Sequence, residues 1–159
     1  MSINVWGPIT WYLFHSLAEK IQDEYFIEEK ENILTLFKKV CNCLPCPSCK
    51  EHAINSMRKA NFKNIKTKKD LKLFLMEFHN IVNSNTNKKI QFTLEQLTDK
   101  YKLANINNIV TQFINTYNKP GGNPSVSLSN LLPKKDAINF LISWYSKTQH
   151  KFQHFQIKN

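Results

Sequence analysis

Residues 33–49 read ILTLFKKVCNCLPCPSC, and this stretch contains the pattern that decides the fold. Its apolar residues recur at intervals of three or four positions, which is the spacing of one face of an α-helix. They are Ile33, Leu34, Phe37, Val40 and Leu44. Pro45 disfavours helical backbone at the residue before it, so we expect this helix to end near Leu44. A further helix is then expected to begin around Cys46.

Helical spacing continues on both sides of this stretch, and we find no convincing run of the period-two alternation that is typical of strands. We expect one helix to follow Pro8, because a proline suits the first turn, where its missing N–H would be unpaired anyway. Thr93 and Gln96 predict a capping box that opens a helix at Leu94. The clearest break is the segment 119–124, KPGGNP. Further apolar stripes occupy residues 71–82, 106–117 and 137–145. The sequence therefore predicts an all-α fold.

The length and charge of the chain limit its functional class. Its 159 residues suffice for one compact domain, or for a small domain with an appendage. No apolar run approaches the roughly 20 residues needed to cross a bilayer, and we see no signal segment, so we expect a soluble protein with no membrane partner. The formal net charge of +10 favours acidic partners, but the lysines are scattered in pairs, as on solvated helix faces. This pattern argues against nucleic-acid binding as the main function.

All four cysteines fall between Cys41 and Cys49, and such clustering indicates redox chemistry or metal binding rather than a disulfide scaffold. Cys46 and Cys49 are one helical turn apart, which permits a disulfide when Cys46 is at a helix N-terminus. There the helix dipole favours a thiolate, the form that attacks and leaves in disulfide exchange. Cys41 and Cys43 would point to different faces of a continuing helix, so we interpret them as buried apolar residues, with an electron relay as the alternative.

Two other classes of protein use the Cys-X-X-Cys spacing. A thioredoxin-like enzyme needs a strand before its motif, whereas the residues before Cys46 have helical spacing. Structural zinc sites usually draw two ligand pairs from separate segments, and no second pair at suitable spacing is found outside 41–52, so we predict no metal site. The alternative function is a zinc-stabilised basic module that binds nucleic acid or an acidic protein.

Three segments together resemble the Erv/ALR family of FAD-linked sulfhydryl oxidases, especially its shorter branch in large cytoplasmic DNA viruses. Their order and spacing over roughly the first hundred residues carry the resemblance, because each segment alone is weak. The segments are WGP at 6–8 with Trp11 and His15, LPCPSC at 44–49 with His52 and Ala53, and FHNIVN at 78–83 with NKK at 87–89.

The resemblance implies a four-helix bundle with a short fifth helix over residues 1–104. Residues 105–159 lie outside the resemblance, and their apolar spacing predicts a helical C-terminal extension of unknown role. It implies that FAD binds at the mouth of the bundle, that Cys49 faces the flavin, and that Cys46 exchanges disulfides with the incoming thiol. Oxygen would accept the electrons and become hydrogen peroxide. The implied substrate is a thiol protein, such as a thioredoxin-like or small viral redox protein. The implied enzyme is a homodimer in the cytoplasm, viral factory or virion.

The resemblance also implies which residues contact FAD. Aromatic and imidazole faces would sandwich the adenine, and a lysine would neutralise the pyrophosphate. The positions that match are Gly7, Trp11, His15, His79, Asn80, Val82, Asn83 and Lys88. The chain departs from the family in having no cysteine after Cys49, Pro8 where an arginine is common, and Thr86 where a leucine is common.

Overall fold

The computed structural model describes the backbone of residues 1–119 and 124–154, and the side chains of 1–119 and 131–154. Within these residues the regular structure is helical, apart from one isolated β-bridge between Ile21 and Phe152. The elements are α1 (Ile3–Lys20), α2 (Asp23–Cys41), α3 (Pro47–Lys59), η1 (Phe62–Asn64), α4 (Lys68–Asn85), α5 (Leu94–Tyr101), α6 (Ile106–Asn118), α7 (Pro124–Thr148) and η2 (Gln149–Lys151). The predicted all-α fold is confirmed.

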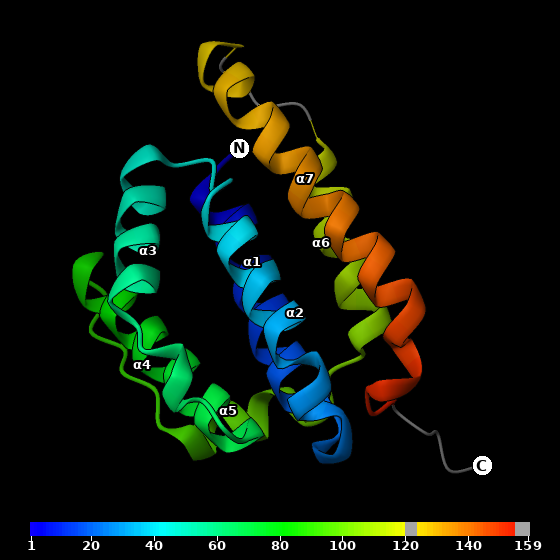
Figure 1. The fold of residues 1–159 in the computed structure, drawn as a ribbon. Coiled ribbons are helices and arrows are strands. Elements are labelled where there is room, and N and C mark those ends of the chain that lie inside the picture. Colours follow the sequence, from blue (N-terminus) through cyan, green and yellow to red (C-terminus); the bar gives the residue numbers. More distant parts are fainter. Residues whose placement is uncertain (120–123, 155–159) are drawn as a thin grey trace.

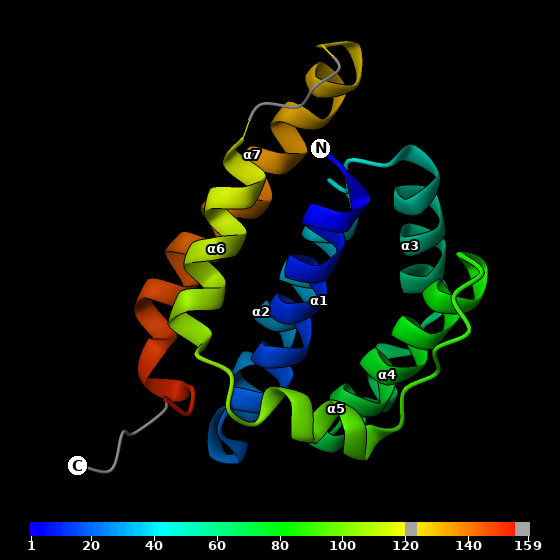
Figure 2. The same ribbon diagram turned by 180° about the vertical axis from the view of Figure 1, so that it is seen from behind.

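Helices α1 and α2 form the middle of the molecule, with α3, α4 and α5 on one side and α6 and α7 on the other (Figures 1 and 2). α1 contacts α4, α5 and α6, while α2 contacts α3 and α7. The two central helices therefore contact both the other N-terminal helices and the helices of the C-terminal extension.

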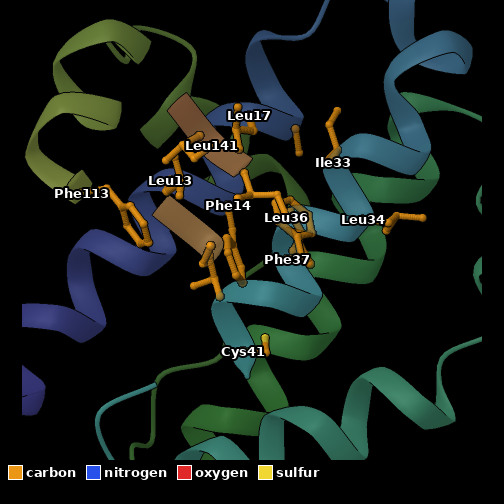
Figure 3. Close-up of a cluster of buried hydrophobic side chains, with 14 of the residues drawn as sticks. Leu13, Phe14, Leu17, Ile33, Leu34, Leu36, Phe37, Cys41, Phe113 and Leu141 are labelled. Atoms are coloured by element: carbon orange, nitrogen blue, oxygen red, sulfur yellow. The ribbon is translucent and has the colours of Figure 1, made fainter. Parts of the chain in front are cut away.

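The hydrophobic core lies between α1 and α2 (Figure 3). Leu13 and Phe14 of α1 are buried, and the Phe14 ring lies 4.3 Å from that of Phe37 of α2. Phe113 of α6 and Leu141 of α7 are also fully buried in the same cluster. Burial of a side chain of this size contributes about 1.5–3 kcal/mol, so the extension and the bundle stabilise one another through a common core.

Several predicted helix boundaries are confirmed. Gln96 N–H donates to Thr93 Oγ1 at 3.2 Å and Thr93 N–H donates to Gln96 Oε1 at 2.9 Å, which is the expected capping box of α5. α3 begins directly after Cys46, as Pro45 and the cysteine spacing predicted. α4 ends at Asn85, three residues after the predicted stripe at 71–82.

Three predicted boundaries are wrong. α1 begins at Ile3, capped by Ser2, so Pro8 lies inside the helix instead of near its start. α7 begins at Pro124, well before the predicted stripe at 137, and contains Pro133. In both helices the proline removes only one hydrogen bond, and the remaining turns outweigh that loss. α2 ends at Cys41, three residues earlier than Leu44. The part of the predicted break at 120–123 lies outside the described residues.

The C-terminal end of the chain is fixed to α2 by a buried carboxylate. Glu29 accepts hydrogen bonds from Lys151 Nζ and Trp144 Nε1, both at 2.6 Å, and from Asn32 Nδ2 at 2.9 Å. Burial alone would raise the pKa of Glu29, but the three donors hold the pKa below its usual range. Trp144, which sequence spacing places only on an apolar stripe, therefore also has a polar role.

Candidate functional site

The redox pair, Cys46 and Cys49, stands at the start of α3. The two residues are joined by a disulfide, and their Cα atoms are 5.2 Å apart, which is a normal separation for such a bond. Cys46 is the N-cap of α3, and its Sγ accepts a hydrogen bond from Cys49 N–H at 3.2 Å. Pro47 follows at the first helical position, where its fixed backbone angle suits the helix.

The surroundings of Cys46 favour its thiolate. Its sulfur lies at the positive end of α3, whose first turn contains no acidic residue. Ser48 Oγ is 3.3 Å from Cys46 Sγ and can donate a hydrogen bond to it. Cys46 is partly exposed and Ser48 is exposed, so a thiol from outside can reach the bond. Cys46 is therefore suited both to be attacked and to leave as an anion.

A cavity of about 330 Å³ opens beside the redox pair, between α1, α3, α4 and α5. Cys49 lines this bundle cavity, whereas Cys46 is absent from the described residues that line it. The residues that line it include Gly7, Thr10, Trp11, Cys41, His79, Val82, Asn83, Lys88, Phe92, Lys100 and Tyr101. The two sulfurs of one disulfide thus have different surroundings.

Four aromatic rings form a continuous stack, and three of them, Trp11, His79 and Tyr101, line the cavity. The Trp11 and His79 rings are parallel within 7°, with centroids 3.8 Å apart. His15 Nε2 lies 3.0 Å from His79 Nδ1, and the His15 ring stacks on Tyr101 with centroids 4.9 Å apart. No planar ring fits between faces in van der Waals contact, so in this structure Trp11 and His79 offer one outer surface instead of the expected sandwich.

Both histidines of this stack are neutral near pH 7. Burial, then His79 and Lys100, lowers the pKa of His15 to about 3. Burial, then the positive charges of Lys100 and Lys88, lowers the pKa of His79 to about 4. One neutral ring therefore donates the His15–His79 hydrogen bond and the other accepts it.

We expect the protein to lose stability in mild acid because of these histidines. Unfolding returns them to a pKa of about 6.5, so below that pH the unfolded state binds more protons than the folded state. The contribution of the two histidines to the free energy of unfolding should change little above pH 6.5. Between pH 7.5 and 5.0 it should lower the free energy of unfolding by about 2–4 kcal/mol. Urea denaturation at the two pH values measures the difference.

The control for this pH dependence is a comparison of two glutamine variants. His15→Gln should lose a large part of the acid-dependent destabilisation, whereas His150→Gln, on an exposed residue outside the stack, should retain it. An equal acid response in both variants would show that the His15–His79 pair is not its source.

Two asparagines of α4 fix the segment that follows the helix. The Asn80 side chain donates to the Phe92 carbonyl at 2.9 Å and accepts from Phe92 N–H at 2.8 Å. Asn83 donates from Nδ2 to the Ile90 carbonyl at 3.0 Å. These bonds hold residues 88–92 along α4, so the two side chains position the cavity wall through the backbone.

The end of α4 directs Lys88 to the cavity. Asn87 has a positive φ of 56°, Asn87 N–H donates to the Ser84 carbonyl, and Lys88 N–H donates to the Asn83 carbonyl at 2.9 Å. This is the Schellman arrangement that ends a helix through one left-handed residue, for which asparagine is well suited. The chain turns sharply there, and Lys88 becomes a wall residue.

Comparison with known proteins identifies the fold family. The sequence model of the Erv1 / Alr family matches residues 8–102, which include the redox pair and the α4 asparagines. The chain belongs to this family.

Viral proteins are among its relatives. A FAD-linked sulfhydryl oxidase of African swine fever virus (Warthog isolate) is 32% identical over 85 residues, which cover 54% of this chain and 71% of the relative. A provisionally named FAD-linked sulfhydryl oxidase of invertebrate iridescent virus 3 is 26% identical over 106 residues, 65% of this chain and 71% of the relative. A similarly named protein of frog virus 3 is 29% identical over 85 residues, 52% of this chain and 57% of the relative. No solved structure matches the chain significantly.

The bundle cavity of this Erv1 / Alr protein fits the chemistry of a flavin dinucleotide. Trp11 and His79 provide flat ring surfaces, and Lys88 and Lys100 provide positive charge for a pyrophosphate. Cys49 lies in the same wall, next to the space that an electron acceptor would occupy. A volume of about 330 Å³ lies within the range of small-molecule sites.

The residues expected to contact FAD divide into two groups. Gly7, Trp11, His79, Val82, Asn83 and Lys88 line the cavity. His15 and Asn80 are not among the lining residues: His15 supports His79 from behind, and the Asn80 amide is engaged by Phe92.

Sequence reasoning missed the contribution of α5. Lys100 and Tyr101 line the cavity, and Lys100 Nζ lies 5.4 Å from the centroid of the Tyr12 ring and 5.7 Å from that of Phe92. The only signal in the sequence was the helical spacing of Leu97 and Tyr101, which indicates packing and does not indicate which cavity a neighbouring lysine reaches.

The extension also reaches the cavity wall, through α6. The hydroxyl of Tyr117, which is fully buried, lies 2.7 Å from Thr10 Oγ1. Thr10 lines the cavity and donates its own hydroxyl proton to the Trp6 carbonyl at 2.7 Å. Tyr117 must therefore be the donor to Thr10, and this contact links the wall to a helix outside the matched segment.

Cys41 and Cys43 are free thiols with 2% and 1% of their surface exposed. Burial raises the pKa of Cys43 to about 12, and burial raises the pKa of Cys41 further. Cys43 Sγ donates to the Val40 carbonyl at 3.4 Å. Protonated, enclosed thiols are poor nucleophiles, so the structure favours the interpretation of both cysteines as packing residues. Cys41 also lines the cavity.

The described residues contain no group of three or more His, Cys, Asp or Glu side chains that could hold a metal ion. Among the same residues, none of the helices is both long and apolar enough to cross a bilayer.

Proposed function

We propose that this chain oxidises paired thiols of a protein substrate to a disulfide and transfers the electrons through Cys46, Cys49 and FAD to oxygen, giving hydrogen peroxide. Its membership of the Erv1 / Alr family, whose viral members it resembles, makes it a FAD-linked thiol oxidase. The observation that carries the finer proposal is the placement of one disulfide across two environments, with Cys49 in the wall of the bundle cavity and Cys46 outside it.

The reaction begins at Cys46. A substrate thiolate attacks Cys46 Sγ, the bond between Cys46 and Cys49 breaks, and Cys49 leaves as a thiolate facing the cavity. A second substrate thiolate then attacks the substrate sulfur bound to Cys46, which forms the substrate disulfide and releases Cys46 as a thiolate. The helix N-terminus stabilises this anion. The redox pair now holds two electrons that came from the substrate.

Wall residues of the cavity would hold the flavin. Trp11 and His79 provide an outer ring surface for stacking, and Lys88 and Lys100 would meet the phosphates. FAD, when bound, supplies a two-electron acceptor that passes the electrons to oxygen. His79 is neutral near pH 7 and therefore contributes a surface without adding charge.

The wider assignments are part of the same proposal. Residues 1–104 would carry the chemistry and 105–159 would support it, as the contact between Tyr117 and Thr10 suggests. The substrate would be a thioredoxin-like or small viral redox protein, and the enzyme would act as a homodimer in the host cytoplasm, viral factory or virion.

One experiment separates this proposal from the alternative of a zinc-stabilised basic module. The purified protein should be yellow, with the absorbance spectrum of bound flavin, and should consume oxygen and form hydrogen peroxide when dithiothreitol is added. A zinc module would be colourless, inert toward dithiothreitol, and unfolded by a chelator. A colourless protein that does not take up FAD on incubation would refute the proposed function.

A further inference from the structure

The first turns of α1 form one wall of the bundle cavity, and a proline interrupts their hydrogen bonds. Trp6, Gly7 and Thr10 line the cavity. Pro8 lies among them and has no N–H group, so the Asn4 carbonyl lacks the backbone hydrogen bond that an α-helix would otherwise give it. This part of the wall therefore has one backbone hydrogen bond fewer to hold its shape.

Two side-chain hydrogen bonds support the helix at this turn. Thr10 Oγ1 donates to the Trp6 carbonyl at 2.7 Å, which joins the residues on either side of Pro8. The Tyr117 hydroxyl lies 2.7 Å from the same Oγ1 and donates to it. Because the Thr10 hydroxyl donates one hydrogen bond and accepts another, its orientation is fixed, and the wall is connected to α6.

Tyr117 is itself held firmly. α6 packs along α1, on the side of the central helices away from α4 (Figure 2). The Tyr117 ring is fully buried and stacks on that of Phe113, with centroids 4.2 Å apart. Burial raises the pKa of Tyr117, so the hydroxyl keeps the proton that it donates. A phenylalanine would fill the same space without the cost of burying a hydroxyl, so packing alone does not explain a tyrosine here.

We propose that Tyr117 is a positioning residue for the flavin, which acts through Thr10 to fix the start of α1 as a wall of the cavity. This inference rests on the proposed function, because it concerns the FAD that the oxidase would hold, and it gives the extension a defined part in cofactor binding. Tyr117 is not among the described residues that line the cavity, so its effect passes through Thr10. Without the Tyr117 hydroxyl, the Thr10 side chain is free to rotate and the turn at Pro8 is free to shift.

The test measures how fast flavin leaves the flavin-loaded protein after dilution, followed by the rise in flavin fluorescence. Tyr117→Phe keeps the ring and removes the donor, so flavin release should be about tenfold faster than from the wild type, as expected for one lost hydrogen bond. Thr10→Val removes the acceptor and should accelerate release to a similar extent. Thr10→Ser keeps the hydroxyl, and its release rate should stay within about threefold of the wild-type rate.

The double variant Tyr117→Phe/Thr10→Val shows whether the two residues act as a pair. Thr10→Val already removes the hydrogen bond between them, so adding Tyr117→Phe should not accelerate flavin release further. Release rates that multiply in the double variant would show that Tyr117 does not act through Thr10, which would overturn the inference.

Tyr145→Phe is the matched control. Tyr145 of α7 is also buried, and its hydroxyl donates to Asn107 Oδ1 of α6 at 2.7 Å. Neither residue is among the described residues that line the cavity. Tyr145→Phe should lower the midpoint of urea denaturation, as Tyr117→Phe does, but its rate of flavin release should stay within about twofold of the wild-type rate.

The comparison of the two tyrosine variants separates positioning from plain stabilisation. Equal release rates from Tyr117→Phe and Tyr145→Phe, in a protein whose wild type binds flavin and oxidises dithiothreitol, would overturn the positioning role alone. If Tyr117→Phe does not fold, equal release from Thr10→Val and Thr10→Ser would overturn it in the same way. A wild-type protein that binds no flavin would instead refute the proposed function, and this inference with it.

Discussion

Cys46→Ser and Cys49→Ser should each lower the turnover of dithiothreitol and of protein thiols by about a thousandfold or more, while flavin content stays unchanged. Cys46→Ser removes the sulfur that the substrate attacks, and Cys49→Ser removes the sulfur that must leave toward the cavity. Neither variant can form the disulfide that accepts the first electron pair. Oxygen consumption measures turnover, and the ratio of flavin to protein absorbance measures the bound cofactor.

The two variants should differ in how they react with an external disulfide reagent. Cys49→Ser keeps Cys46 at the partly exposed helix N-terminus, so its thiolate should react quickly and form a stable mixed disulfide. Cys46→Ser keeps Cys49 in the cavity wall, and its reaction should be several times slower when flavin is bound. Equal rates would contradict the assignment of Cys46 as the outer cysteine.

Cys43→Ala is the control for both variants. Its thiol is buried and its pKa is about 12, so the substitution should preserve turnover at neutral pH apart from a modest loss of stability. Loss of turnover in a folded, flavin-loaded Cys43→Ala protein would instead indicate that Cys43 takes part in an electron relay.

Local patterns in the sequence predicted local structure well. The capping box of Thr93 and Gln96, and the start of α3 after Cys46, depend on residues only a few positions apart. The start of α1 was predicted wrongly because Pro8 was given more weight than the cap at Ser2, whereas the start of α7 was missed because the apolar stripe marks only the packed part of a longer helix. One lost hydrogen bond does not end a helix that tertiary contacts stabilise.

The candidate site was predicted only in part because its details depend on contacts between distant segments. Residue types and spacing, with the family resemblance, named eight residues as FAD contacts, and six of these line the cavity. They did not show that His15 reaches His79, 64 positions away, or that the Asn80 amide is engaged by Phe92. Lys100 was missed for the same reason, since nothing near it in the sequence indicates which cavity it faces.

Glu29→Ala should lower the free energy of unfolding by about 3 kcal/mol, because it removes the acceptor of three hydrogen bonds. The substitution leaves Trp144 Nε1 buried without its present acceptor, and it takes from Lys151 one of its two carboxylate partners. Since these contacts hold η2 and the end of α7 against α2, we expect the extension to loosen first. Urea denaturation, followed by tryptophan fluorescence, measures the loss.

Glu28→Ala is a close control, since Glu28 also accepts a 2.6 Å hydrogen bond from Lys151. The Glu28 side chain is 64% exposed, whereas that of Glu29 is 4% exposed. An exposed ion pair gains little because water screens it, so Glu28→Ala should cost less than about 1 kcal/mol. Similar losses in both variants would show that burial and the Trp144 contact do not determine the strength of this anchor. A large loss confined to Glu29→Ala would show that the anchor of the extension depends on a single buried carboxylate.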